Sequence, residues 1–149
     1  MKKIKCTNFG NLNWKQPQNN LDWLLDSGAT DHMTGNKNIL YNYQKTKGQE
    51  FVYVANGDRM EICGYGSTII FSKEIKNILH VKNCTANLLS IGKFSKEINC
   101  EIIFSSKNVF FQDIISKRMI GEGIFQNGLY FLNNIKCYFN AKIQDMGQL

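Results

Sequence analysis

The apolar residues of this chain fall in short runs that are separated by Gly, Asn, Asp and Ser. Ile, Val, Phe and Tyr dominate these runs, and β-branched and aromatic side chains are typical of strands. The predicted strands are residues 21–26, 51–55, 59–63, 66–71, 77–81, 100–104, 109–113 and 129–132. Many short strands with turn residues between them are typical of an all-β barrel or sandwich. The pattern therefore predicts an all-β domain.

Residues 90–99 depart from the strand pattern and predict a short helix. Ile91, Phe94 and Ile98 have the spacing of one helix face, which would pack on the barrel. Ser90 precedes them and can accept a hydrogen bond from a backbone amide of the first turn. We therefore expect Ser90 to cap this helix.

Turn residues predict the structure of one further segment, and polarity predicts that of another. Asn56 and Gly57 lie between two predicted strands, and Asn-Gly favours a tight two-residue hairpin because both residues can adopt positive φ. We expect a projecting hairpin there. The long polar segment 30–50 shows no clear period and is expected to be a loop or an irregular strand.

The length of 149 residues and the apolar fraction of 43% fit one globular domain. We expect residues 21–132 to form this domain. Residues 1–20 are polar and contain the single proline, so they predict a flexible lead-in, and residues 133–149 predict a C-terminal tail. Four lysines and no acids lie in residues 1–20, which leaves +2 of the net charge of +6 for the rest of the chain. A basic segment of this kind can make weak contact with nucleic acid.

The five cysteines are odd in number, widely spaced, and without a Cys-x-x-Cys pair. This spacing indicates neither a disulfide framework nor a zinc cluster, so we expect no metal and no cofactor. The first residues lack an apolar stretch after their lysines, and no apolar run has the length of a membrane span. We expect a reducing intracellular, cytoplasmic location and no membrane partner.

Candidate chemistry lies at the end of the first predicted strand, where Asp26, Ser27 and Gly28 follow three apolar residues. A carboxylate beside a hydroxyl and a glycine amide is half of an aspartic-protease site, and the reaction needs two facing carboxylates. We therefore expect a homodimer. Asp-Ser-Gly is also a common turn, so the tripeptide alone leaves a purely structural role open. A serine nucleophile is disfavoured because no Gly-x-Ser-x-Gly elbow surrounds Ser27.

A longer set of motifs resembles one known family. The motifs are Trp-Leu-Leu-Asp-Ser-Gly-Ala-Thr-Asp-His-Met-Thr-Gly (23–35), Val-Tyr-Val-Ala-Asn-Gly-Asp (52–58), Ile-Cys-Gly-Tyr-Gly (62–66), Ile-Leu-His-Val (78–81), Asn-Leu-Leu-Ser (87–90) and Gly-Leu-Tyr-Phe-Leu (128–132). In this order they resemble the retropepsin-like aspartic protease of copia-type retrotransposon Gag-Pol polyproteins. The resemblance implies a closed β-barrel with a flap hairpin, processing of a polyprotein in a virus-like particle, and a tail that leads toward a pre-integrase region.

The resemblance also implies roles for individual residues. Asp26 would be the catalytic aspartate that each subunit contributes, with Ser27 and Gly28 as its supporting loop. Residues 54–59 would form the flap over an extended polyprotein peptide, which would pair with strand edges. The residues expected to contact this substrate are Ala29, Thr30, Asp31, Val54, Ala55, Asn56, Gly57 and Asp58.

Two departures from related proteins motivate an alternative. Ser90 and Ile91 stand where retroviral proteases have Gly and Arg, so the dimer contacts of that Arg are lost. The lead-in resembles a decayed zinc knuckle that keeps Cys6 alone of four ligands, and a structural zinc takes four protein ligands. The alternative is a catalytically inactive or domesticated β-barrel fragment that binds protein or nucleic acid.

Four other side chains have chemistry that invites a functional role. We expect His32 and His80 to be structural, since neither has a sequence motif that links it to a partner. Tyr53 and Tyr65 could stack on bases, but we expect them to pack within strands.

Overall fold

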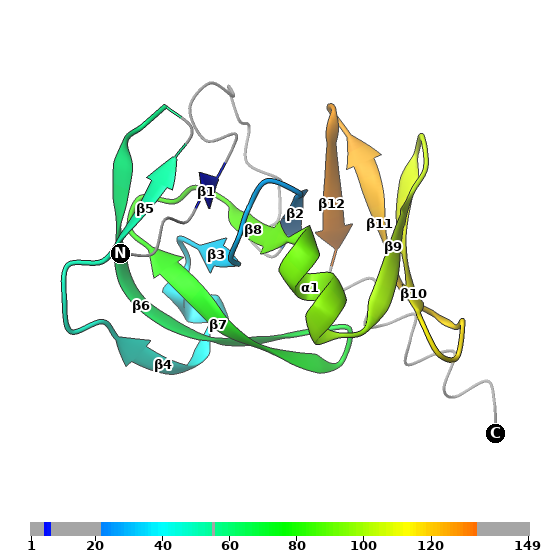
Figure 1. Ribbon diagram of the computed structural model, residues 1–149, viewed down its shortest axis with the longest axis horizontal. Coiled ribbons are helices and arrows are strands. Elements are labelled where there is room, and N and C mark those ends of the chain that lie inside the picture. The colour runs from blue at the N-terminus through cyan, green and yellow to red at the C-terminus, as the bar shows by residue number, and fades with distance from the viewer. Residues whose placement is uncertain (1–4, 7–21, 55, 134–149) are drawn as a thin grey trace.

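A computed structural model of the chain describes residues 5–6, 22–54 and 56–133, and strands predominate in these ranges (Figure 1). The first elements are β1 (Lys5–Cys6), β2 (Asp22–Asp26), β3 (Met33–Thr34), the 3₁₀ helix η1 (Lys37–Ile39), β4 (Tyr41–Lys45) and β5 (Phe51–Val54). The later elements are β6 (Arg59–Ile70), β7 (Lys73–Val81), β8 (Asn87–Ser90), α1 (Ile91–Glu97), β9 (Cys100–Phe104), β10 (Asn108–Asp113), β11 (Met119–Gln126) and β12 (Leu129–Asn133). The all-β class and the short helix predicted from the sequence are confirmed.

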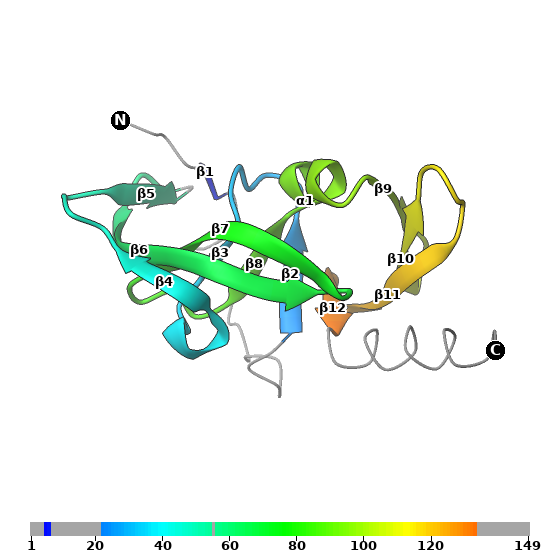
Figure 2. The same ribbon diagram turned by 90° about the horizontal axis from the view of Figure 1, so that it is seen from below.

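The strands pair in the order β1-β5-β6-β7-β3-β8-β2-β12-β11-β10-β9, and β4 pairs with β6 beside this path. Within the described residues the path is open between β1 and β9, so the expected closure of the barrel is not confirmed. Figure 1 shows the β5–β6 hairpin at one end of the long axis and β9 to β11 at the other. β6 and β7 form a hairpin that runs along the molecule between these ends (Figure 2).

Strand β2 lies between two hydrophobic cores. Trp23 and Leu25 belong to one cluster with Phe94 and Phe111, whereas Leu24 belongs to a second cluster with Leu88. Successive side chains of a strand point to opposite faces, and this explains why the apolar run before Asp26 does not alternate with polar residues. Its neighbours are β8 in parallel and β12 in antiparallel. The strand end is therefore fixed by packing on both faces.

Helix α1 starts where the sequence predicts. The Ser90 side chain accepts a hydrogen bond from the Lys93 backbone amide, as an N-cap residue does. Phe94 and Ile98 are buried, and Ile91 packs at the edge of the same core. The predicted helix continued to Asn99, but α1 ends at Glu97, and Asn99 has a φ of 53°.

Strand β6 was predicted as two strands with a break near Gly64, and this is wrong because β6 is continuous. Its register with β7 shifts at two places near Gly64 and Gly66. A side chain at Gly64 would clash with Tyr43, and one at Gly66 would press on Leu40. These glycines allow a close approach of the β4 segment, and they do not form a turn.

Other differences from the predicted elements involve segments that pair with strands distant in the sequence. The sequence pattern missed β11, because Gly121 and Gly123 interrupt its apolar residues. These glycines make room for the Phe71 ring and for the Phe131 backbone. The segment 30–50, expected to be a loop or an irregular strand, contains β3, η1 and β4, and the pairing of β4 with β6 has a register shift. Of the lead-in, residues 1–20, only Lys5 and Cys6 lie within the described residues, and as β1 they pair in parallel with β5.

Candidate active site

The Asp26 carboxylate is held at the end of β2. Asp26 pairs in register with Ser90 at the end of β8, and it is 8% exposed. The backbone amide of Gly28 donates a hydrogen bond of 2.8 Å to Oδ1 of Asp26. The side chain of Asp26 thus closes a turn over Ser27, as short acidic residues do. A carboxylate with this support is fixed in orientation, which acid–base chemistry requires.

Ser90 ties the loop after Asp26 to the start of the helix. Its hydroxyl donates to the backbone carbonyl of Ala29 at 2.7 Å, and its backbone amide donates to Nδ1 of His32 at 3.0 Å. The same hydroxyl oxygen accepts the Lys93 amide at 3.3 Å. Ser90 therefore braces the loop after Asp26 from two sides. A glycine at this position would lose both hydroxyl contacts.

His32 has a structural environment. The ring is fully buried and meets Phe94 edge-on, with ring centroids 6.4 Å apart. Because Nδ1 accepts from Ser90, the proton of the neutral ring sits on Nε2. Burial, assisted by the positive charge of Lys93, lowers the pKa of His32 to about 3.

The environment of Nε2 explains why His32 stays neutral. Nε2 makes no hydrogen bond among the described residues, although Oε1 of Glu97 lies 3.4 Å from it. That carboxylate alone would favour the charged ring. Lys93 lies 3.8 Å from the same oxygen, and burial raises the pKa of Glu97, so desolvation dominates. His32 is a neutral hydrogen-bond acceptor for the Ser90 amide and is not a base poised for catalysis near neutral pH.

The expected flap is a hairpin, but its turn differs from the predicted one. The Gly57 amide donates to the Val54 carbonyl at 3.0 Å, and the Val54 amide donates to the Asp58 carbonyl at 2.9 Å. Gly57 has a φ of +88°. This is a three-residue loop with a glycine bulge, so the predicted two-residue turn is wrong. Asn56 and Asp58 brace it through two side-chain hydrogen bonds of 2.9 Å.

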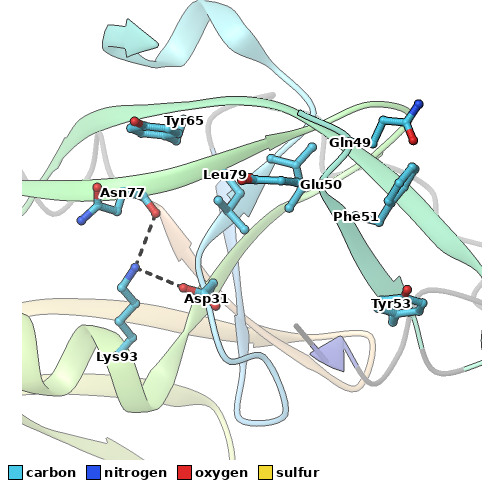
Figure 3. A pocket seen from close by; sticks show the side chains of 10 residues that line it. Asp31, Gln49, Glu50, Phe51, Tyr53, Tyr65, Asn77, Leu79 and Lys93 are labelled. Carbon is cyan, nitrogen blue, oxygen red and sulfur yellow. Dashed lines mark hydrogen bonds and ion pairs between the residues drawn. The ribbon is translucent and has the colours of Figure 1, made fainter. Parts of the chain in front are cut away.

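A cavity of about 620 Å³ lies between the base of this hairpin and helix α1 (Figure 3). Its lining residues are Asp31, Gln49, Glu50, Phe51, Tyr53, Ile62, Tyr65, Asn77, Leu79 and Lys93. Nζ of Lys93 lies 3.5 Å from Asp31 and 3.4 Å from the Asn77 carbonyl, as Figure 3 shows. The cavity thus joins the loop after Asp26 to the base of the hairpin.

The structure brings some of the expected substrate residues together and separates others. Asp31 lines the first cavity, whereas Val54, Asn56 and Asp58 line a second one of about 590 Å³. Ala29 is buried, Thr30 is exposed, and neither lines these two cavities. Ala55 lies outside the described residues. The sequence assigned no role to Lys93 or Glu50. These residues are far apart in the sequence and line one cavity only in the folded chain, so no sequence motif contains both.

Other candidate chemistry has structural partners. The Tyr43 hydroxyl and Nδ1 of His80 are 2.8 Å apart, and burial lowers the pKa of His80. In the ranges that the structure describes, His, Cys, Asp and Glu side chains do not gather in groups of three that could hold a metal ion. The described helices are too short or too polar to cross a membrane. Of the segment that resembles a decayed zinc knuckle, only the backbone of Cys6 lies within the described residues.

Comparison with known proteins shows that the chain is similar to Pol polyproteins of retroelements. The family model described as "Pol polyprotein, beta-barrel domain" matches residues 23–99. The chain is 32% identical over 124 residues to the retrovirus-related Pol polyprotein from transposon RE1 of Arabidopsis thaliana. It is 30% identical over 124 residues to that from transposon RE2. Each alignment covers 80% of this chain and 8% of the relative.

A yeast protein and the solved structures complete the comparison. A putative transposon Ty5-1 protein of Saccharomyces cerevisiae is 26% identical over 70 residues, which is 47% of each chain. No solved structure matches the chain significantly. The chain therefore spans a small part of the plant relatives and about half of the yeast one.

Proposed function

Because this chain belongs to the family of Pol polyprotein β-barrel domains, we propose that it is an aspartic endopeptidase that processes a retrotransposon Gag-Pol polyprotein. It acts as a homodimer with one Asp26 from each chain, in a reducing intracellular setting. The observation that carries the proposal is the Asp26 carboxylate, which β2 holds at its end and the Gly28 amide orients at 2.8 Å.

The chemistry follows from two carboxylates that face each other. Two Asp26 side chains across a twofold axis cannot both ionise, so they share one proton. The ionised carboxylate removes a proton from water, and the protonated one polarises the carbonyl of the scissile peptide bond. The Gly28 amide keeps each carboxylate in place. A single chain has half of this machinery.

The surroundings of Asp26 support this chemistry. Ser90 fixes the carbonyl of Ala29 and the ring of His32, so the loop that follows Asp26 has little freedom. The β5–β6 hairpin stands on the other side of the cavity that Asp31 lines. An extended peptide between them can pair its backbone with strand edges, and such pairing presents a peptide bond to the dyad.

The test is cleavage of a Gag-Pol-like polyprotein substrate by the purified full chain. Asp26→Asn keeps the shape of the side chain and removes its charge, so we expect cleavage to fall by at least about a hundredfold. Asp22→Asn is the matched control, since it makes the same change four residues earlier on β2 and should stay within about twofold of wild type. Equal cleavage by wild type and Asp26→Asn would contradict the proposed mechanism.

Sedimentation of the same preparation separates this proposal from the non-catalytic alternative. A dimer at the working concentration supports the shared dyad. A strict monomer favours a β-domain that binds protein or nucleic acid, and salt-dependent binding of single-stranded RNA that is lost on deleting residues 1–20 would identify the nucleic-acid version.

A further inference from the structure

The cavity beside Asp31 has an excess of negative charge. Its lining includes two acids, Asp31 and Glu50, and one base, Lys93. Lys93 is engaged by Asp31 at 3.5 Å and by Glu97 at 3.8 Å. Among the described residues, no basic side chain pairs with Glu50. The two carboxylates beside Lys93 therefore offset its charge, and the charge of Glu50 is not offset.

Aromatic rings form another part of the lining. Phe51, Tyr53 and Tyr65 come from the two strands of the hairpin. The face of an aromatic ring carries partial negative charge and attracts cations. The chain already uses one of these rings in this way, because the guanidinium of Arg59 lies 4.4 Å from the centroid of Phe51. The rings and Glu50 thus favour the same kind of ligand.

The remaining wall has two amide residues, Gln49 and Asn77, and two apolar residues, Ile62 and Leu79, and the apolar pair suits a long aliphatic stem. Ile62 and Leu79 line the cavity from β6 and β7. In Figure 3, Glu50 and Phe51 approach from the hairpin side, while Lys93 and Asp31 approach from the helix side. A side chain of a bound peptide that enters this cavity would place its methylene groups against Ile62 and Leu79, with its charged end near Glu50.

We propose that this cavity is a specificity subsite for one Lys or Arg side chain of the peptide substrate. The inference rests on the proposed function and adds the chemistry of the substrate. Glu50 and the rings of Tyr53 and Tyr65 bind the cation, since the ring of Phe51 already holds Arg59, and Ile62 and Leu79 contact its stem. Lys93 positions Asp31 at the opening. An acidic substrate side chain would have to take Lys93 from Asp31 and Glu97, and it would meet Glu50.

The experiment is digestion of a peptide library of mixed sequence by the full chain, with the cleaved bonds identified by mass spectrometry. We expect Lys and Arg together to be enriched about tenfold over Asp and Glu at one fixed position from the cleaved bond. In Glu50→Gln this enrichment should fall at least about threefold at that position. Enrichment at the other positions should not change.

Glu101→Gln is the matched control, because it removes the same charge from an exposed residue of β9, which does not line the cavity. It should keep the wild-type preference. An acidic preference, no preference, or a basic preference that Glu50→Gln leaves intact would each overturn the subsite while the protease proposal stands. Absence of any cleavage that depends on Asp26 would overturn the proposed function and the subsite with it.

Discussion

Acidification should destabilise this fold through one buried side chain, His32. The ring is fully buried and its Nδ1 accepts the Ser90 amide, so the folded protein needs the neutral form. Its pKa falls from 6.5 to about 3 in the folded chain. The unfolded chain therefore binds more protons than the folded chain between these two values. The stabilisation is complete above pH 6.5 and is lost as the pH falls toward 3.

The size of the effect follows from the pKa difference. Each pH unit below 6.5 costs about 1.4 kcal/mol of the free energy of unfolding while the folded ring stays neutral. Between pH 7 and pH 4.5 the loss is therefore about 2–3 kcal/mol, a large part of the stability of a domain of this size. Burial raises the pKa values of Asp22 and Glu97, and these shifts act in the opposite direction. A matched variant is needed to isolate His32.

The assay is urea unfolding of wild type and His32→Asn at pH 7, 6, 5 and 4.5. Asn has an oxygen that can accept the Ser90 amide but does not titrate in this range. The variant should be less stable at pH 7 because it leaves a gap beside Phe94. The difference between the two proteins should shrink by about 2–3 kcal/mol on going to pH 4.5. A difference that stays constant with pH would refute the neutral, buried assignment of His32.

Other substitutions test the bracing of the loop and the close contacts of the sheet. Ser90→Ala removes the bond to the Ala29 carbonyl and the helix cap, so it should cost about 1–2 kcal/mol in urea unfolding. It should also lower kcat for peptide cleavage more than it raises KM, and an unchanged kcat would argue against the brace. Gly35→Ala would push a methyl group into the Cys84 carbonyl, whereas Gly48→Ala meets nothing within 4 Å. The first should therefore lose about 1–3 kcal/mol relative to the second, and equal thermal midpoints would contradict the packing.

The part of the fold that local sequence determines was predictable. The apolar run before Asp26 is buried on both faces of β2, and Ser90 caps α1, as the sequence indicates. These features depend on neighbouring residues in the chain. The position of β9 was likewise predicted at its observed bounds, since Ile102, Ile103 and Phe104 form a short apolar run at its end.

The predictions that were wrong concern features that depend on contacts between distant segments. A glycine in the sequence predicts a turn. Gly64 and Gly121 instead lie within strands, where the missing side chain makes room for Tyr43 and for Phe71. No local pattern distinguishes a glycine that turns the chain from one that allows close packing. The hairpin turn also differs from the predicted one, since Asn56 binds Asp58 with its side chain and the Val54 amide donates to the Asp58 carbonyl.

In the candidate site, too, the features formed by adjacent residues were predictable and those formed by distant residues were not. Asp26 and its turn were predictable because the acid, the hydroxyl and the glycine are adjacent. The cavity was not, because Glu50, Tyr65 and Lys93 come from a loop, a strand and a helix that only the fold brings together. The neutral state of His32 likewise depends on burial that its sequence neighbours do not show.

Mixing of subunits shows whether each active site uses one Asp26 from each of two chains. Wild-type and Asp26→Asn chains are unfolded together, refolded at a fixed total concentration, and assayed for peptide cleavage at several ratios. If two carboxylates are required, activity falls as the square of the wild-type fraction, so an equal mixture keeps about a quarter of the activity. Activity that falls in direct proportion to the wild-type fraction would show that one chain suffices and would contradict the account.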